Sequence, residues 1–207
     1  MSKRKLGVIG GTFDPIHIGH LQLAQSVYEH MGLEKVLFVP AYIAPHKLGQ
    51  RFAPAEDRYE MTRLAVQDKP HFNLTDMELR RSGVSYTIDT VKELKTLYTD
   101  CELFFIIGED TVTQLHTWHR IRELLQMVTF VASGRPGYDG VMELVEKNLG
   151  VAAVKKIILL DTPEYDVSST KIREYLRCGK ALTGLVPSAV ESYIRQRGLY
   201  GATEVKV

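Results

Sequence analysis

GVIGGTFDPIHIGH, residues 7–20, combines three kinds of local structure in a short space. The apolar run at its start predicts a buried strand, which two glycines end. A polar turn with Asp14 and Pro15 follows. His17 and His20 come next, at the start of an amphipathic segment. A strand, a glycine turn and a helix in this order predict an α/β fold that receives phosphates at the turn.

Apolar, β-branched runs recur along the chain between amphipathic segments. They are residues 6–10, 35–40, 102–108, 128–133 and 155–161. The amphipathic segments include 21–32 and a stretch after residue 108 with Leu115, Ile121, Leu124 and Leu125 as its apolar positions. This alternation predicts a Rossmann-like parallel sheet with helices on both faces. Continuous apolar runs, without strict alternation, indicate strands that are buried on both sides.

The C-terminal part is expected to be small and helical, beginning near residue 168. Residues 187–198 predict a final helix, with proline at its start and glycine beyond its end. Residues 134–140 are rich in glycine and proline, which predicts a surface loop. Because no internal repeat or low-complexity linker interrupts the chain, we expect residues 1–207 to form a single domain.

Composition excludes several classes of protein. Of the residues, 44% are hydrophobic and 25% are charged, which is typical of globular proteins. The formal net charge of +1 argues against a broad nucleic-acid surface but permits a basic pocket for a small anion. No apolar stretch approaches the roughly 18 residues of a membrane span. Cys101 and Cys178 lack the spacing of a zinc or redox pair, and so few thiols favour the reducing cytoplasm.

The glycine turn and the two histidines predict a phosphate site of an unusual kind. Neither a dinucleotide G-x-G-x-x-G pattern nor a Walker A loop is present. His17 and His20, three positions apart, can both meet one ligand and donate hydrogen bonds to phosphate oxygens. Gly19 permits close approach at a cost in helix stability. A lone histidine is more often a cap or a surface residue, but this pair behind Gly10 and Gly11 favours function.

A second anion-binding segment is VSSTKIR, residues 167–173. It offers three good N-cap residues, Ser168, Ser169 and Thr170. A helix that begins here presents hydroxyls and backbone amides to a triphosphate, with added charge from Lys171 and Arg173. Alone, the segment would be a capped helix with solvated cations. Together with the histidines, it indicates a triphosphate site.

Other candidate residues lie in loops between these two segments. Lys47, in the loop after the second strand, can neutralise charge between two phosphate-bearing substrates, although a solvated lysine is the plain alternative. Tyr86 and Thr87 stand at a turn before a helix. Trp118, in a polar surround, could stack on a flat aromatic ring, although a lone tryptophan more often packs in a core. The remaining candidates, for ribose hydroxyls, are Gly108 and Asp110.

GGTFDPIHIGH resembles the signature of the nucleotidyltransferase superfamily with the (H/T)-x-G-H motif. VSSTKIR resembles its I-S-S-T-x-I-R motif, with valine in place of isoleucine. The resemblance implies that His17 and His20 contact the ATP phosphates and that His20 stabilises the transition state at the α-phosphorus. It also implies that Thr12 and Phe13 lie along the nucleotide and the second substrate.

In their order along the chain, the motifs resemble the bacterial nicotinate-nucleotide adenylyltransferase family. The motifs span almost the whole chain and are, in order, GGTFDPIHIGH, PHK, SYTIDT, IIGED, the Trp118 segment, GRPG and SSTKIR. The resemblance implies that Lys47 meets the phosphates and that His46 lies near the second substrate. It further implies that Thr87 meets the nicotinate carboxylate, Trp118 stacks on the pyridine ring and Arg135 belongs to an adenosine-side loop.

This resemblance implies transfer of AMP from ATP to nicotinate mononucleotide, with deamido-NAD and pyrophosphate as products. The acceptor phosphate would attack in line, without a covalent intermediate, so positioning and charge neutralisation matter more than a base. Mg²⁺ would arrive on ATP, with no protein metal site. The expected catalytic residues are His17, His20, Lys47 and Arg173. The expected ATP-binding residues are Gly10, Gly11, Thr12, Phe13, His17, Gly19, His20, Gly108, Asp110, Arg135, Ser168, Ser169, Thr170 and Arg173. The residues expected to bind nicotinate mononucleotide are Thr12, His46, Lys47, Tyr86, Thr87 and Trp118.

Several alternatives stay open. An adenylyltransferase for phosphopantetheine would share the H-x-G-H chemistry, but it would not need the Y-T-x-D-T and tryptophan combination. A cytidylyltransferase would need CTP-reading residues, which we do not identify. A catalytically silent nucleotide-binding module is the alternative from a different class, and a tRNA binder is disfavoured by the net charge. We expect small-molecule partners, no nucleic acid and no membrane, and a homo-oligomer is compatible with the sequence.

Overall fold

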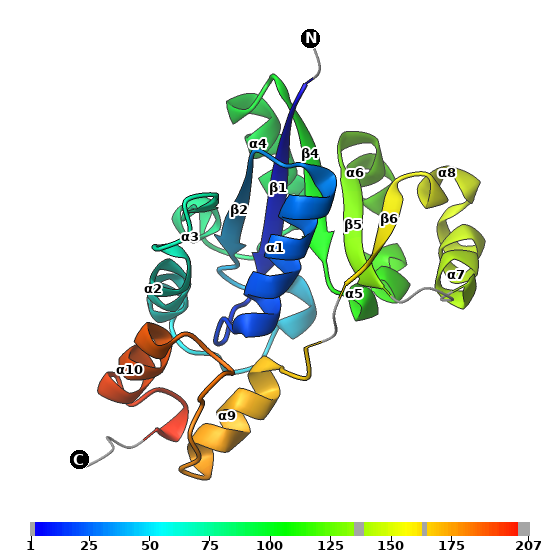
Figure 1. Cartoon of the computed structure of the whole chain (residues 1–207). Coiled ribbons are helices and arrows are strands. Elements are labelled where there is room, and N and C mark those ends of the chain that lie inside the picture. The colour runs from blue at the N-terminus through cyan, green and yellow to red at the C-terminus, as the bar shows by residue number, and fades with distance from the viewer. Residues whose placement is uncertain (1–2, 135–138, 163–164, 203–207) are drawn as a thin grey trace. The chain divides into compact units, whose positions relative to one another are not determined.

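The computed structural model of the chain describes residues 3–134, 139–162 and 165–202 (Figure 1). Within these residues the strands form a six-stranded sheet with the order β3-β2-β1-β4-β5-β6, which is the order of Rossmann sheets. The strands are β1 (Arg4–Gly11), β2 (Lys35–Pro40), β3 (Phe72–Leu74), β4 (Cys101–Ile107), β5 (Thr129–Gly134) and β6 (Ile157–Asp161). The predicted fold class is confirmed.

Helices lie on both faces of the sheet (Figure 1). The helices of the described residues are α1 (Ile18–Met31), α2 (Ala55–Val66), α3 (Met77–Arg81), α4 (Thr87–Leu97), α5 (Glu109–Gln114), α6 (Ile121–Met127), α7 (Asp139–Leu149), α8 (Val151–Val154), α9 (Ser169–Arg177) and α10 (Ser188–Gln196). Three short 3₁₀ turns are η1 (Pro45–Lys47), η2 (Leu115–Thr117) and η3 (Leu199–Gly201). No helix within the described residues is long and apolar enough to cross a membrane.

The chain divides into two compact units, which are described separately. Unit 1 comprises Met1–Gly10, Leu23–Leu37 and Ser85–Pro163. Unit 2 comprises Gly11–Gln22, Phe38–Val84 and Glu164–Val207. The single domain expected from the sequence stays a prediction.

Unit 1 carries the parallel pairings of β1 with β4, β4 with β5 and β5 with β6. In register, Ile9 lies opposite Ile106, and Phe130 lies opposite Ile157. The middle strands are buried almost throughout, since five consecutive residues from Leu103 onward in β4 are buried. Strands covered on both faces have no polar face to alternate, which explains the continuous apolar runs in the sequence.

The stretch after β4 differs from the amphipathic segment expected there. It forms α5, η2 and α6 as separate short pieces. The chain becomes extended at Trp118, and Arg120 takes a left-handed conformation with φ 56° just before α6. These two backbone positions break the helical period, which the spacing of apolar residues alone did not reveal.

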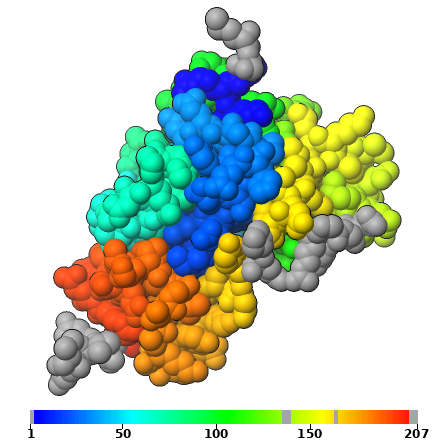
Figure 2. Space-filling view, in the orientation of Figure 1, coloured from blue at the N-terminus to red at the C-terminus, as the bar shows by residue number. Residues whose placement is uncertain are grey.

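Unit 2 contains the C-terminal helical part, and its two main helices form as predicted. α9 begins directly after Ser168, and α10 follows Pro187. Figure 2 shows their surface in orange to red. α10 packs against α2, and η3 packs against both α9 and α10. Helix α2 and strand β3 have no counterpart in the sequence-based prediction, because their residues show no strong periodicity.

Candidate active site

The turn that follows Gly11 in unit 2 places the Phe13 side chain against the histidines. Phe13 takes a positive φ of 48°, and its side chain is 2% exposed. A Cβ atom at Gly11 would lie 2.9 Å from the Phe13 ring, so glycine is required there. The Phe13 ring meets His20 edge to face, at 5.1 Å between centroids. The buried Phe13 ring therefore packs against His20 and limits the positions that the imidazole can take.

His17 and His20 form a stacked pair. Their ring centroids are 3.6 Å apart and the rings are inclined by 27°. Helix α1 begins at Ile18, so His17 immediately precedes it and His20 lies in its first turn. The backbone N–H of His17 donates to Nδ1 of His20, at 3.2 Å. The predicted juxtaposition of the two imidazoles is thus present.

Burial sets the charge of both rings. It lowers the pKa of His17 from 6.5 to about 4. Burial also lowers the pKa of His20 well below 6.5, and the neighbouring His17 and Lys47 lower it further. Both imidazoles are therefore neutral near pH 7. Since Nδ1 of His20 accepts a hydrogen bond, its proton resides on Nε2, which is left to donate to a ligand.

The start of α1 offers fewer free amides than a helix N-terminus normally provides. The His17 N–H is taken by the His20 ring. The Ile18 N–H donates to the Leu185 carbonyl, at 2.9 Å. An anion at this helix would therefore depend more on side-chain donors than the sequence pattern suggests.

Gly19 is where the second motif meets the first. A Cβ atom at this position would lie 3.0 Å from Val167 and 3.2 Å from Nδ1 of His17. The close approach that Gly19 permits is thus made by Val167, which belongs to the second motif. A larger residue at this position would require Val167 or the His17 ring to move by a few tenths of an ångström.

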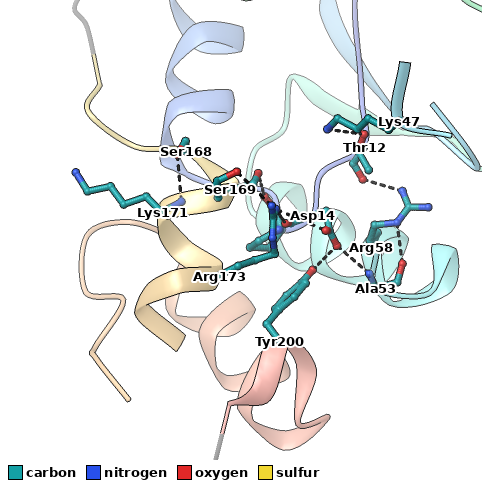
Figure 3. Close-up of polar contacts among 12 residues, drawn as sticks. Thr12, Asp14, Lys47, Ala53, Arg58, Ser168, Ser169, Lys171, Arg173 and Tyr200 are labelled. Carbon is teal, nitrogen blue, oxygen red and sulfur yellow. Dashed lines mark hydrogen bonds and ion pairs between the residues drawn. The ribbon is translucent and has the colours of Figure 1, made fainter. Parts of the chain in front are cut away.

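The second motif is attached to the turn through backbone carbonyls (Figure 3). The Ser169 hydroxyl donates to the Pro15 carbonyl at 2.9 Å, across 154 positions of sequence. Arg173 donates to the Asp14 carbonyl at 2.8 Å, across 159 positions. These two hydrogen bonds hold together segments that are far apart in the sequence.

Within the second motif, each side chain has a separate role. Ser168 is the N-cap of α9, because its side chain accepts from the Lys171 N–H at 3.2 Å. Thr170 accepts from Arg173, also at 3.2 Å. The Lys171 ammonium pairs with Asp166 at 2.8 Å, so it is not held toward the turn as Arg173 is. Arg173 is therefore the cation that this motif supplies.

Lys47 joins the same group of side chains from η1 (Figure 3). Its ammonium donates to the Thr12 hydroxyl, at 3.1 Å. Burial lowers the pKa of Lys47, Asp14 partly opposes this, and Arg173 and Arg58 lower it further. His46, its neighbour, is exposed.

Two residues of this network were not singled out from the sequence. The Asp14 carboxylate is 2% exposed and accepts from the Ala53 N–H at 3.0 Å and from the Tyr200 hydroxyl at 2.8 Å. Its other oxygen, Oδ2, lies 3.6 Å from the Arg173 guanidinium. Asp14 stands in the opening motif, which is a usable signal, but nothing in the sequence links it to Tyr200.

Of the candidates for the second substrate, Tyr86, Thr87 and Trp118 lie in unit 1, and Thr12, His46 and Lys47 lie in unit 2. Tyr86 immediately precedes α4 and Thr87 begins it, with no side-chain cap. Trp118 is half-buried, and its ring packs edge to face against Phe105 at 6.0 Å and Phe130 at 5.8 Å. The tryptophan is therefore both anchored by the core and partly open to a ligand.

Gly108 and Asp110 also lie in unit 1, at the start of α5. Gly108 is the N-cap residue and Asp110 is in the first turn, and both are exposed. Gly10 is the last residue of unit 1 before the turn and is exposed as well. Arg135 lies outside the residues that the structure describes. Among those it does describe, there is no group of three or more His, Cys, Asp or Glu side chains that could hold a metal ion.

Comparison with known proteins gives consistent results. A model of the cytidylyltransferase-like family matches residues 8–175. A probable nicotinate-nucleotide adenylyltransferase of Desulfitobacterium hafniense (strain Y51) is 41% identical, over 95% of this chain and 96% of that protein. One from Bacillus pumilus is 42% identical, over 95% and 98%. The structure of Plasmodium falciparum nicotinic acid mononucleotide adenylyltransferase with NaAD matches with a TM-score of 0.79, 18% identity and coverage of 97% and 98%. At that identity the likeness shows the fold.

Proposed function

Because the chain belongs to the cytidylyltransferase-like family and, with relatives of 41–42% identity, to the nicotinate-nucleotide adenylyltransferases, we propose that it joins nicotinate mononucleotide to AMP from ATP. It is an enzyme of the nucleotidyltransferase class. The products of the proposed reaction are deamido-NAD and pyrophosphate.

The observation that carries this proposal is the convergence of neutral and cationic donors on one turn of unit 2. His17 and His20 stack at 3.6 Å, Lys47 donates to Thr12, and Arg173 donates to Asp14. A triphosphate carries several negative charges, so it needs cations as well as directional hydrogen-bond donors. The group supplies both within one compact unit.

His20 is proposed to stabilise the transition state. With Nδ1 held by the His17 amide, the Nε2–H of His20 is fixed in direction and needs no reorganisation to donate. The low pKa of His20 keeps its imidazole neutral at physiological pH, and the neutral ring with its proton on Nε2 can donate one hydrogen bond there. We infer that it donates to a non-bridging oxygen of the α-phosphate as charge builds there.

The proposed reaction is a single displacement. An oxygen of the acceptor's phosphate forms a bond to the α-phosphorus while the bond to the bridging α–β oxygen breaks. The departing pyrophosphate takes that electron pair. Lys47 and Arg173 are proposed to hold the β- and γ-phosphates and so to stabilise the charge that pyrophosphate gains. Mg²⁺ bound to ATP would share this task, as part of the substrate.

The nicotinate ring is assigned to residues of unit 1. A half-open indole, braced by two phenylalanines, offers a rigid face for stacking on a pyridine ring. The first turn of α4 has no side-chain cap at Tyr86, so the amides at Thr87 are available to a carboxylate. We assign Trp118 and Thr87 to acceptor recognition on these grounds. Gly108 and Asp110 are assigned to ribose hydroxyls.

The reducing cytoplasm is the proposed compartment. Cys101 is buried and Cys178 is exposed, and both are free thiols. Free thiols persist where glutathione and thioredoxin keep them reduced. The sequence-based expectation of a homo-oligomer stays a prediction.

Pyrophosphate release tests the proposed function. The enzyme would be incubated with Mg²⁺–ATP and, separately, with nicotinate mononucleotide, nicotinamide mononucleotide or phosphopantetheine. We expect release with the nicotinate nucleotide, and a parallel preparation of His20→Asn controls for contaminating activity. Release with phosphopantetheine alone would keep the phosphate chemistry but remove the acceptor assignment. ATP binding without release in any mixture would indicate a nucleotide-binding module.

A further inference from the structure

Arg58 is a buried arginine that the proposed chemistry does not use. It belongs to α2, in unit 2, and is 2% exposed. Its guanidinium forms hydrogen bonds to four backbone carbonyls: Thr12 at 2.7 Å, Ala41 at 2.6 Å, Tyr42 at 2.9 Å and Ala53 at 3.1 Å. Four charge-assisted bonds to main chain give this side chain one fixed position.

The carbonyls belong to three different segments of unit 2. Thr12 is in the turn between β1 and the histidines. Ala41 and Tyr42 begin the loop that leads from β2 to Lys47. Ala53 lies just before α2 itself. Arg58 therefore ties the loop that leads to Lys47 to the turn of the histidines. Figure 3 shows its hydrogen bonds to Thr12 and Ala53.

The two segments also meet through Lys47, on the other side of Thr12. The Thr12 carbonyl accepts from Arg58, while the Thr12 hydroxyl accepts from Lys47. A displacement of Thr12 relative to Ala41 would thus move the ammonium group directly. Arg58 is the one guanidinium of the described residues for which hydrogen bonds to both Thr12 and Ala41 are present.

Burying a guanidinium among carbonyls has a cost. Burial lowers the pKa of Arg58, which shows that the charged form is disfavoured, and the Asp14 carboxylate only partly offsets this. Replacement of Arg58 by an apolar side chain would remove this cost, but it would leave the four carbonyls without this donor. The hydrogen bonds of Arg58 therefore satisfy these carbonyls and also fix the two loops relative to each other.

We propose that Arg58 is a positioning residue that sets the place of Lys47 relative to the His17–His20 pair. The proposal rests on the proposed function, since it assumes that Lys47 acts on the triphosphate. Arg58 itself touches no reacting atom in this account. Its influence passes through Thr12 and the loop that begins at Ala41.

A double-mutant cycle with Arg58→Lys and Lys47→Met tests this. Lysine keeps the charge and most of the aliphatic stem but cannot reach all four carbonyls. We expect Arg58→Lys to lower kcat/KM for ATP by about 100-fold, as a misplacement of about 1 Å can. In the Arg58→Lys enzyme Lys47 is already misplaced, so its loss should matter less. We expect the fold-decrease in kcat/KM caused by Lys47→Met to be at least about ten times smaller there than in the wild type.

Arg63→Lys, on the same helix, is the matched control. Arg63 is exposed and donates to Glu60 at 2.7 and 2.8 Å, far from any assigned role. We expect Arg63→Lys to leave kcat/KM unchanged and to leave the effect of Lys47→Met as large as it is in the wild type. If the effects of Arg58→Lys and Lys47→Met on the free energy of activation were fully additive, the proposal would be overturned. Wild-type activity in a folded Arg58→Lys enzyme would also overturn it.

Thr12→Val decides the matter if Arg58→Lys does not fold. Valine keeps the backbone carbonyl for Arg58 and the shape of threonine, but it removes the acceptor for Lys47. We expect Thr12→Val to lower kcat/KM by about tenfold or more. Lys47→Met should then lower kcat/KM by a smaller factor in the Thr12→Val enzyme than in the wild type. Unchanged activity would overturn the proposal.

The outcome is distinguishable from failure of the proposed function. If the wild type releases no pyrophosphate with nicotinate mononucleotide, the reaction assignment has failed on its own. The same cycle would then be measured on the dissociation constant for ATP. Coupling between Arg58 and Lys47 in ATP binding would support the positioning role, and additivity there would overturn it.

Discussion

At the scale of single residues, His20 combines two tasks that one imidazole can perform at once. Its Nδ1 accepts a hydrogen bond from the His17 N–H and so satisfies a backbone donor at the start of α1. This leaves Nε2–H as a donor of fixed direction. Phe13 supports the ring from below. The spacing of the histidines predicts their proximity, but the tautomer depends on a hydrogen bond that only the folded backbone creates.

His20→Asn separates the two tasks. The asparagine oxygen can take the place of Nδ1 and accept the hydrogen bond from the His17 N–H. The variant has no group at the position of Nε2. We expect kcat to fall by about 10² to 10³, as for the loss of one transition-state donor, while the melting temperature changes little. Steady-state kinetics and thermal unfolding measure the two effects.

His30→Asn is the control for a histidine in the same helix. His30 is exposed in the last turn of α1, where it contacts the Ser26 carbonyl at 2.8 Å, and its replacement should leave kcat unchanged. A folded His20→Asn enzyme with near-wild-type kcat would remove the role assigned to Nε2.

The low pKa of His17 predicts a pH dependence of stability. The unfolded histidine titrates near 6.5, and the folded one near 4. Between these values the unfolded chain binds the extra proton, so the free energy of unfolding decreases as pH falls from about 6.5 to 4. At about pH 5 the loss from this residue amounts to at most about 2 kcal/mol.

His17→Gln tests that prediction, because it removes the titrating group. Urea unfolding of both proteins would be compared at about pH 7.5 and pH 5. The wild type should lose more stability than the variant between these conditions. Equal losses would show that the His17 pKa is not lowered in the folded protein.

At the scale of elements, the junction of α1 and α9 is the central feature. The cap types ahead of α9 and the glycine turn ahead of α1 were both predictable, because these signals are local. Arg58 was not: its helix shows weak periodicity, and an arginine in such a segment normally indicates a solvated face. The carbonyls that it binds come together only after the loops have folded.

Gly19→Ala tests the junction. An added methyl group would lie 3.0 Å from Val167 and 3.2 Å from the His17 ring, so one of these side chains must move by a few tenths of an ångström. We expect a loss of about 1–3 kcal/mol in unfolding free energy, together with weaker ATP binding. Chemical unfolding and calorimetry with ATP measure the two.

Gly140→Ala is its matched control, since Gly140 lies in α7 with nothing within 4 Å of an added Cβ. There alanine should be neutral or stabilise by about 0.5–1 kcal/mol. If Gly19→Ala behaved in the same way, the packing of Val167 against this position would not matter for binding.

At the scale of the whole molecule, the sequence predicted the Rossmann-like sheet because most of its strands are continuous apolar runs that alternate with amphipathic segments. The strand order and the short β3 were not predictable, since three residues carry no period. The candidates for the phosphates named above, His17, His20, Lys47 and Arg173, belong to unit 2, and the candidates for the pyridine ring belong to unit 1. Only folding reveals this division.

Trp118 provides a test of that division. Trp118→Ala should raise KM for nicotinate mononucleotide by about tenfold, the value of a lost stacking contact, and change KM for ATP by less than about twofold. Trp118→Phe should fall between the wild type and the alanine variant. As the chain has one tryptophan, quenching of its fluorescence by the nicotinate nucleotide would report binding directly. Equal increases in both KM values would argue against stacking on the acceptor.

The most direct test of the central claim is the product formed from nicotinate mononucleotide and ATP with a chiral α-phosphorothioate, examined by phosphorus NMR. In-line transfer without a covalent intermediate predicts the thio-analogue of deamido-NAD, with inverted configuration at the α-phosphorus. Formation of that dinucleotide with retained configuration would contradict the single displacement. Consumption of ATP without any dinucleotide product would contradict the assigned reaction.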